Sequence, residues 1–380
     1  MSDRKKILCI VPLPLPITGA ATASEIVVNY LKGEHEVTVL AYQRGNLISG
    51  GFSLEQFVRI FVIVIRLLFL KKKFDAAYLV ISSTFWGNMR DIFFLIVMGK
   101  DLRKKTVLHL HGANIDRYLK ESPFWIKYLN RKLFREVKNA IVLGNFFNNI
   151  FEGYIDNSKI RIVENSFDPA LLIPEGKLIQ KFTSVEKVKI IFLSNLIKEK
   201  GYEILLDAFL ALPDFISNKA ELHFAGEFYS YEEKNLFLNK IGNHKNIFFH
   251  GSVAGKKKQE LFWTAHIFCL PSFYRYEGQP ISIIEAYASG CFVIITSNGG
   301  IIDIFGSGIN GLFIDIDIDI DIDVDVFRER LNKQLDMLIS DIEKYKDIAH
   351  FNFKEASKKY TQDIFCKKIS HILIGRQQIL

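Results

Sequence analysis

The sequence predicts an α/β protein of two domains, and three observations lead to that prediction. Its 380 residues exceed the size of a typical single domain. Short apolar runs, suited to buried strands, alternate with longer segments of helical periodicity, as in sheets covered by helices. Residues 267–295 also have the pattern of a strand, loop, helix, strand unit, which is typical of an α/β sheet.

Composition indicates an ordinary globular protein, with 49% hydrophobic and 24% charged residues. Residues 1–165 contain 24 lysines and arginines against 14 acidic residues. Such a basic half suits anionic lipid headgroups or a phosphorylated substrate. It lacks the interleaved basic and aromatic residues of nucleic-acid-binding modules, so no nucleic-acid partner is expected. The cysteines show no paired spacing, which favours a reducing cytoplasm: Cys9, Cys269, Cys291 and Cys366.

The N-terminal segment has the composition of a secretory signal, with Lys5 and Lys6 before an apolar run. Prolines interrupt that run, and it continues directly into an amphipathic helix and a strand at 36–41. We therefore expect a strand, loop, helix, strand unit instead. The predicted domains are residues 1–170 and 188–360, joined by a polar linker at 171–187. The other expected strands are 76–82, 106–110, 140–143, 160–163, 188–193, 221–225, 247–250 and 267–270.

Residues 267–295 form the most informative stretch. A strand at 267–270 leads through a polar aromatic loop into a helix from about residue 281 to 289. The amide groups at that helix start suit a phosphate or sugar hydroxyls. Glu277 lies in the loop, and Glu285, eight residues on, can accept hydrogen bonds from a diol. A solvated helix start with incidental acids is the plainer alternative.

The sequence EGQPISIIEA, followed by SGC and an apolar strand, resembles the E-x7-E signature of retaining glycosyltransferases of the GT-B architecture. That family includes sucrose synthase and many lipopolysaccharide and capsule sugar transferases. The resemblance implies two Rossmann-like domains facing across a cleft, with the C-terminal helix, about 361–380, crossing back to the first domain. It implies that Glu285 binds the donor ribose and that Glu277 lies beside the transferred sugar. The residues between them would hold the sugar or its diphosphate: Gly278, Gln279, Pro280 and Ile281.

Lys200 precedes Gly201 at a helix start, where its ammonium can meet a diphosphate. The resembled family has Gly-Arg in this loop and Lys-Gly five residues later. Here Ser194-Asn195 replaces Gly-Arg, so Lys200 is expected to carry more of the charge stabilisation, with Asn195 also at the donor. A non-catalytic partner subunit is the alternative that this departure raises.

Two candidates lie in the first domain. Gly19 lies in the loop after the first strand, where the resembled family often has a glycine pair against the donor phosphate or the acceptor. His111 follows the strand 106–110, and ligands of open α/β sheets bind outside the carboxyl ends of strands. The family commonly has a histidine there, close to the donor sugar. His109, inside the strand, is expected to be packed.

Residues 57–70 are very apolar but too short to span a membrane. They are either a covered helix or a membrane-interface helix with Arg59, Arg66 and Lys71–Lys73 on headgroups. The basic helical segment 114–138 is either an acceptor-side surface or a solvated face. The Ile-Asp repeat at 314–326 is expected to be a surface connection. Its Asp-x-Asp triplets are attributed to low complexity, so no metal site is expected there.

The expected function is therefore retaining, metal-independent transfer from a nucleotide-sugar to a glycan or lipid-linked acceptor, in cell-surface polysaccharide or lipopolysaccharide synthesis. No cofactor is expected. The protein is expected in the cytoplasm, either free or as a peripheral protein on an anionic inner membrane face. A sugar-nucleotide epimerase of related architecture is the other alternative.

Overall fold

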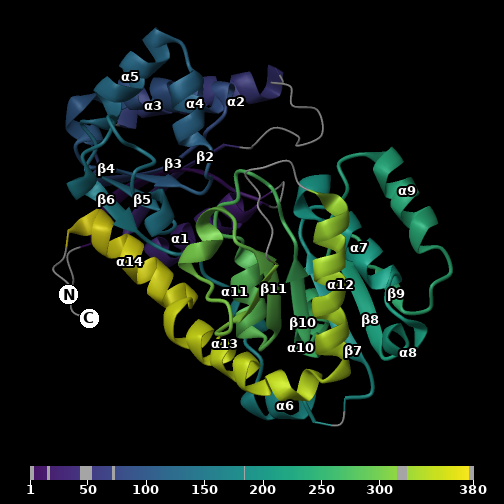
Figure 1. Cartoon of the computed structure of the whole chain (residues 1–380). Helices are drawn as coiled ribbons and strands as arrows, with labels where there is room; N and C mark the ends of the chain where they lie inside the picture. Colours follow the sequence, from purple (N-terminus) through teal and green to yellow (C-terminus); the bar gives the residue numbers. More distant parts are fainter. Residues whose placement is uncertain are drawn as a thin grey trace. The chain divides into compact units, whose positions relative to one another are not determined.

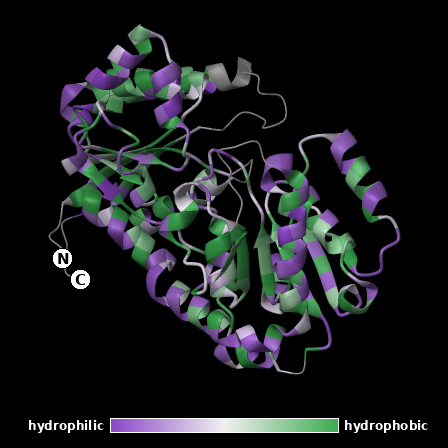
Figure 2. Ribbon diagram, viewed as in Figure 1, coloured by the Kyte–Doolittle hydropathy of each residue, from purple (hydrophilic) through white to green (hydrophobic). Residues whose placement is uncertain are grey.

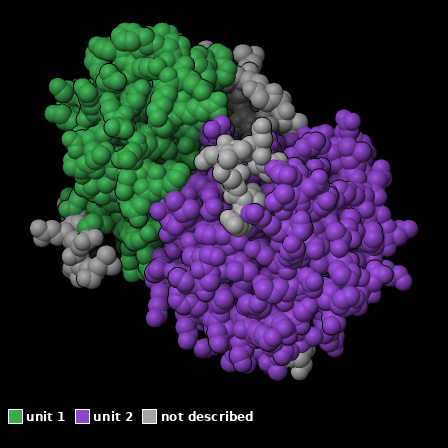
Figure 3. Space-filling model, in the orientation of Figure 1, with its two compact units in different colours: residues 1–165, 362–380 green, residues 166–361 purple. Residues whose placement is uncertain are grey.

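The computed structural model describes residues 4–14, 18–42, 54–70, 73–183, 185–314 and 323–375. The chain divides into two compact units, which Figure 3 colours separately. Unit 1 comprises residues 1–165 and 362–380, and unit 2 comprises residues 166–361. Each unit contains one six-stranded parallel sheet with helices on its faces. This confirms the predicted α/β fold of two Rossmann-like domains.

The sheet of unit 1 has the strand order β2-β1-β3-β4-β5-β6. The four inner strands are almost wholly buried, because helices cover both faces, and Figure 2 shows them mostly in the hydrophobic colour. The apolar run that resembles a secretory signal forms β1, which lies between β2 and β3 in this sheet. The strands are β1 Lys6–Pro12, β2 Glu36–Tyr42, β3 Ala76–Ile81, β4 Thr106–Leu110, β5 Asn139–Val142 and β6 Ile160–Ile162.

Alternation along the strands separates two cores in unit 1. Ile7, Cys9 and Val11 of β1 pack with α1 and α14, whereas Leu8 and Ile10 face the core that includes α2 and α3. Helices α2, α3 and α5 are neighbours in the second layer. The helices are α1 Gly19–Glu34, α2 Leu54–Leu70, α3 Phe85–Arg103, α4 Ile115–Glu121, α5 Phe124–Phe134 and α14 Gln362–Ile374.

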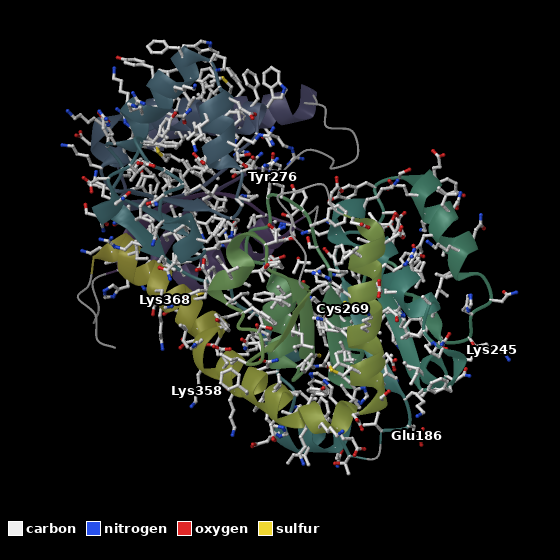
Figure 4. All side chains as sticks on the ribbon, in the orientation of Figure 1. Glu186, Lys245, Cys269, Tyr276, Lys358 and Lys368 are labelled. Carbon is white, nitrogen blue, oxygen red and sulfur yellow. The ribbon has the colours of Figure 1, made fainter. Side chains whose placement is uncertain are left out.

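The last helix, α14, belongs to unit 1. Lys138 Nζ donates to the carbonyl of Leu373 at 2.8 Å, and Lys368, labelled in Figure 4, pairs with Glu164 at 2.8 Å. The segment 114–138, expected as one helical stretch, is two helices, α4 and α5. Pro123 explains the break, because proline disfavours helical conformation in the preceding residue.

The sheet of unit 2 has the order β12-β11-β10-β7-β8-β9. Strand β10 begins and ends where the sequence predicts. The strands are β7 Val188–Leu193, β8 Ala220–Ala225, β9 Ile247–Phe249, β10 Ile267–Leu270, β11 Phe292–Thr296 and β12 Gly311–Ile314. The helices are α6 Glu175–Lys181, α7 Tyr202–Leu210, α8 Asp214–Ser217, α9 Tyr231–Ile241, α10 Gly255–Thr264, α11 Ile281–Ala288, α12 Val324–Ser340 and α13 Lys346–Lys359.

The segment 171–187, predicted as a polar linker, differs from that prediction. Its residues 175–181 form α6, whose Leu178 is fully buried in the core of unit 2. Lys181 Nζ donates to the carbonyls of Ser289 and Gly290 at 2.8 and 3.1 Å. These tertiary contacts, which the polar sequence does not reveal, make the segment part of the domain, and the unit boundary lies at residues 165/166.

Residues 315–322 of the Ile-Asp repeat lie outside the described residues. The end of the repeat, Val324–Val326, is the first turn of α12, whose start is capped by the Asp323 carboxylate. The helix thus begins three residues before the expected Phe327. All four cysteines are buried free thiols. Within the described residues, no helix is long and apolar enough to cross a membrane.

Short 3-10 helices connect several elements in both units. They are η2 Asn145–Phe147, η3 Asn157–Lys159, η4 Pro169–Leu171, η5 Lys198–Lys200, η6 Gly299–Asp303 and η7 Ile342–Tyr345.

Candidate active site

The sheet of unit 2 reverses its strand order between β7 and β10. From β7 the chain runs outward through β8 and β9, then returns to place β10 on the other side of β7 and continues to β11 and β12. Ligands of open α/β sheets bind at such a switch point, outside the carboxyl ends of the strands. Figure 4 marks Cys269 within β10 and Tyr276 in the loop beyond its carboxyl end. The loops that follow β7 and β10 contain the predicted site residues.

The two loops bind each other directly. The amide of Phe273 donates to the carbonyl of Glu199 at 2.8 Å. Gly201 has a positive φ of 77°, and a Cβ there would lie 2.0 Å from the carbonyl oxygen of Pro271. A residue other than glycine would therefore push the loops apart. This close approach brings Lys200 next to Glu277.

Glu277 is 5% exposed, and its Oε2 atom accepts two hydrogen bonds. Lys200 Nζ donates at 2.5 Å and Ser272 Oγ at 2.7 Å. The same ammonium lies 4.9 Å from the centroid of the Tyr274 ring. Burial, followed by the charge of Glu277, raises the pKa of Tyr274. Lys200 thus neutralises a buried carboxylate and is anchored beside it.

The backbone of Glu277 is held from the other side by the loop after β11. The amide of Gly300 donates to the carbonyl of Glu277 at 3.3 Å. Gly299 has φ of 55°, and a Cβ there would lie 2.1 Å from the same carbonyl oxygen. Glu277 is therefore fixed through both its side chain and its main chain.

Glu285 lies in the second turn of α11 and is 4% exposed. Lys258 of α10 donates to its Oε1 atom at 2.6 Å. Helix α10 precedes β10, so its first turns, which contain Lys258, lie at the same edge of the sheet as the start of α11. The two carboxylates of the E-x7-E pattern are each paired with a lysine from a different part of the chain.

The residues between the two carboxylates form the entrance to α11. Pro280 is the N-cap residue, in extended conformation, and no side chain caps the first turn. Gln279 is buried, whereas Gly278 and Ile281 are partly exposed. Uncapped amide groups at a helix start are available to an anion.

Asn195 follows β7, but its side chain is exposed and turned to the next loop. Its Nδ2 atom donates to the Tyr229 hydroxyl at 2.8 Å. Its predicted contact with the donor stays a prediction.

The two remaining candidates belong to unit 1. Gly19 is the exposed first residue of α1, and the Thr18 hydroxyl caps that helix by accepting from the amide of Ala21 at 3.2 Å. Strand β1, which precedes it, lies at the switch point of the first sheet, beside β3. His111 follows β4, with its ring centroid 3.9 Å from that of His109. The roles of both residues stay predictions.

Sequence reasoning missed the residues that hold the two carboxylates. Ser272 and Tyr274 lie in the predicted loop, but nothing in their spacing marks a contact with Glu277 or Lys200. Lys258 precedes Glu285 by 27 positions on another helix, and Tyr229 follows β8. Their roles follow from packing of separate segments, which no local pattern reveals.

Two doubly wound α/β domains are the architecture of GT-B glycosyltransferases, the class that the sequence resembles. Residues 176–351 match the family model "Glycosyl transferases group 1", which confirms the resemblance seen in the sequence and places this domain in that family. An uncharacterized glycosyltransferase of Methanocaldococcus jannaschii is 23% identical over 78% of this chain and 76% of its own. Mannosylfructose-phosphate synthase of Agrobacterium fabrum is 30% identical over 40% of this chain and 34% of its own.

Solved structures share the fold of both units. Anabaena HepE, in complex with UDP and glucose, matches with a TM-score of 0.70 at 17% identity, over 98% of this chain and 100% of that chain. WaaG, a glycosyltransferase involved in lipopolysaccharide biosynthesis, matches with a TM-score of 0.69 at 15% identity over the same shares.

Proposed function

We propose that this protein transfers a sugar, with retention of anomeric configuration, from a nucleotide-sugar donor to a glycan or lipid-linked acceptor. The observation that carries this proposal is the pair of buried lysine–glutamate contacts, Lys200–Glu277 and Lys258–Glu285, on either side of the uncapped start of α11. Packing alone gives no reason to bury two carboxylates at the ligand-binding edge of a sheet. The fold shared with HepE, solved with UDP and with UDP-glucose, supports a nucleotide-sugar donor.

In this proposal Glu285 accepts hydrogen bonds from the ribose diol. The amides of 278–281 bind the diphosphate or sugar, with Asn195 and Gly19 contributing at the donor. Glu277 and His111 lie by the transferred sugar. The bond between the anomeric carbon and the phosphate oxygen breaks, and the acceptor oxygen forms the new bond on the same face. The departing phosphate takes the proton of the acceptor hydroxyl.

Positive charge for the leaving diphosphate comes from the protein. One N–H group of Lys200 is used by Glu277, and the ammonium has two others to donate. Together with the helix start, they stabilise charge that grows in the transition state. We therefore propose that no metal or other cofactor is required.

A test is incubation of the protein with UDP-, GDP-, ADP- and dTDP-sugars and a short glycan acceptor, followed by NMR of the anomeric proton of the first product. The proposal predicts transfer from one donor type with the donor's configuration. An inverted product would contradict retention. Formation of an epimer from donor alone would favour a sugar-nucleotide epimerase, and binding without turnover would favour a non-catalytic subunit.

The acceptor is proposed to be lipid-linked because unit 1 has an apolar surface flanked by cations, the α2–α3–α5 surface. On α2, Val58, Val62, Ile65 and Phe69 form one exposed stripe. Neighbouring α3 and α5 expose further rings, including Trp86 and Phe124. The exposed apolar residues of the surface are Val58, Phe61, Val62, Ile65, Leu68, Phe69, Phe85, Trp86, Phe93, Ile96, Phe124, Trp125 and Tyr128.

The charges on this surface favour an anionic bilayer as its partner. Arg59 and Arg66 lie along one side of the α2 stripe, and α5 contains three cations and no acidic residue. Such a combination of apolar insertion and cations is typical of interfacial membrane helices. We propose that the protein acts on the cytoplasmic face of a membrane, in synthesis of a surface polysaccharide or lipopolysaccharide.

A further inference from the structure

A buried imidazole, that of His109, lies directly against the ring of His111, one of the predicted site residues of unit 1. His109 is 0% exposed within β4, on the sheet face that packs against α1 and α14. Among the described residues, no partner hydrogen-bonds its Nε2 atom. A buried, unpaired polar atom costs about 1–3 kcal/mol, so an aliphatic side chain would stabilise the fold better there. A histidine at this position calls for another explanation.

His109 contacts Tyr78 on the neighbouring strand and His111 at the carboxyl end of β4. Its Nδ1 atom lies 2.5 Å from the Tyr78 hydroxyl, on the neighbouring strand β3. Tyr78 is itself fully buried. At the other end, the His109 ring lies 3.9 Å from that of His111, with an interplanar angle of 33°. Residues two apart in a strand share a face, which explains this contact.

Burial, and then the charge of His111, lowers the pKa of His109 well below its usual range. Tyr78 and the two buried thiols near it are also neutral near pH 7. Burial raises the pKa of the Cys9 and Cys366 thiols to about 12, and it raises the pKa of Tyr78 well above its usual range. The ring of His109 is thus an uncharged, fixed plane.

We propose that His109 is a positioning residue, whose ring, anchored by Tyr78, holds the imidazole of His111 in one orientation at the carboxyl end of β4. The inference rests on the proposed function only for the contact of His111 with substrate. Without this support the His111 ring would spend less time in the productive geometry, so turnover falls, while donor affinity, to which Glu285 and the start of α11 contribute most, is kept.

The test compares Tyr78→Phe, His109→Leu and His109→Phe in the full chain, by NMR of ¹³C-labelled histidine. The His111 resonance is assigned from its loss in His111→Asn. We expect Tyr78→Phe and His109→Leu to move the His111 resonance, and His109→Phe, which keeps a flat ring, to move it less. Val107→Ala is the matched control, since Val107 is buried on the same face of β4. It should lower the melting temperature and leave the His111 resonance in place.

Kinetics give the second readout. Tyr78→Phe and His109→Leu should lower kcat by about tenfold, with donor KM changed by less than about twofold, since a small misplacement of a reacting group costs this much. In a His111→Asn background the same substitutions should change kcat by less than about twofold, because the pair acts as a unit. Unchanged His111 resonances would overturn the proposal. If they move but His111→Asn keeps full activity, positioning stands and the site role of His111 in the proposed function fails.

Discussion

Lys200 Nζ and Glu277 Oε2 lie 2.5 Å apart, joining the loop after β7 to the loop after β10 at the switch point of the second sheet. The side chains are 13% and 6% exposed, so each charge depends on the other. The lysine is therefore required both for the integrity of the site and for the proposed stabilisation of the diphosphate.

A double substitution separates these two roles. Lys200→Met alone leaves a buried carboxylate unpaired and should destabilise the protein by about 3 kcal/mol in urea unfolding. Adding Glu277→Gln removes that charge and should restore most of the lost stability. Turnover should stay low in both variants, because both lack the ammonium and the double variant also lacks the Glu277 carboxylate. Recovery of turnover along with stability would show that Lys200 has only a structural role.

Asn195→Arg should increase turnover. A guanidinium after β7 would supply the second cation that the resembled family has at this position, where growing charge on the diphosphate is stabilised. The control is Asn195→Ala, which loses the hydrogen bond to Tyr229 without adding charge. Initial rates at saturating donor are the measurement. Equal rates for both variants and the native protein would mean that another group supplies the charge.

His266 makes folding stability depend on pH. It is 6% exposed, its Nδ1 atom accepts from the Lys189 amide at 3.0 Å, and its Nε2 atom lies 2.9 Å from the Lys181 carbonyl. Burial, then the charge of Lys181, lowers its pKa to about 3. Between this value and the unfolded value of about 6.5, the unfolded state binds the extra proton. Stability from His266 is thus present above about pH 6.5 and is lost as the pH falls toward 3.

The measurement for His266 is urea unfolding at several pH values, for the native protein and His266→Gln. The difference in unfolding free energy should shrink as the pH falls below 6.5, by at most about 1.4 kcal/mol per pH unit. His244→Gln, at an exposed site, should follow the native curve. A difference between native and His266→Gln that is constant with pH would contradict the assignment of a neutral buried imidazole.

Arg59→Glu combined with Arg66→Glu should release the protein from vesicles that contain anionic lipid. Each well-placed cation contributes about 1 kcal/mol of attraction, which salt weakens. The control reverses two exposed lysines of unit 2, Lys333 and Lys344, and should leave binding unchanged. Sedimentation with neutral and anionic vesicles is the measurement. If the native protein binds neither kind, a water-soluble acceptor replaces the lipid-linked one.

Much of the fold could be predicted because its signals are local. The buried run Ile267–Leu270 and the turn at Pro280 gave β10 and the start of α11 from sequence alone. Residues 175–181 were predicted as linker, whereas they form α6. This helix is held by one buried apolar side chain, Leu178, and by hydrogen bonds of Lys181 to distant carbonyls, and neither contact can be predicted from the local sequence. Its polar sequence resembles that of a solvated connection.

The site was predictable to the extent that its residues share one segment. Glu277 and Glu285 could be proposed together because strand, loop and helix set their spacing. Their partners Lys200 and Lys258 come from other segments, and these pairings depend on how helices and strands pack. The sequence predicts Lys200 as a phosphate ligand, whereas its contact with Glu277 follows from the close approach of Gly201 to Pro271.

The most direct test of the donor site is calorimetric titration of UDP, GDP, ADP and dTDP into the native protein and into Glu285→Gln. If Glu285 binds a ribose diol, one nucleotide should bind the native protein, and Glu285→Gln should weaken it by about 1–3 kcal/mol, or roughly tenfold to 100-fold. Circular dichroism should show both proteins folded. Absence of binding by all four nucleotides, or equal affinity in the two proteins, would contradict a nucleotide-sugar site at the start of α11.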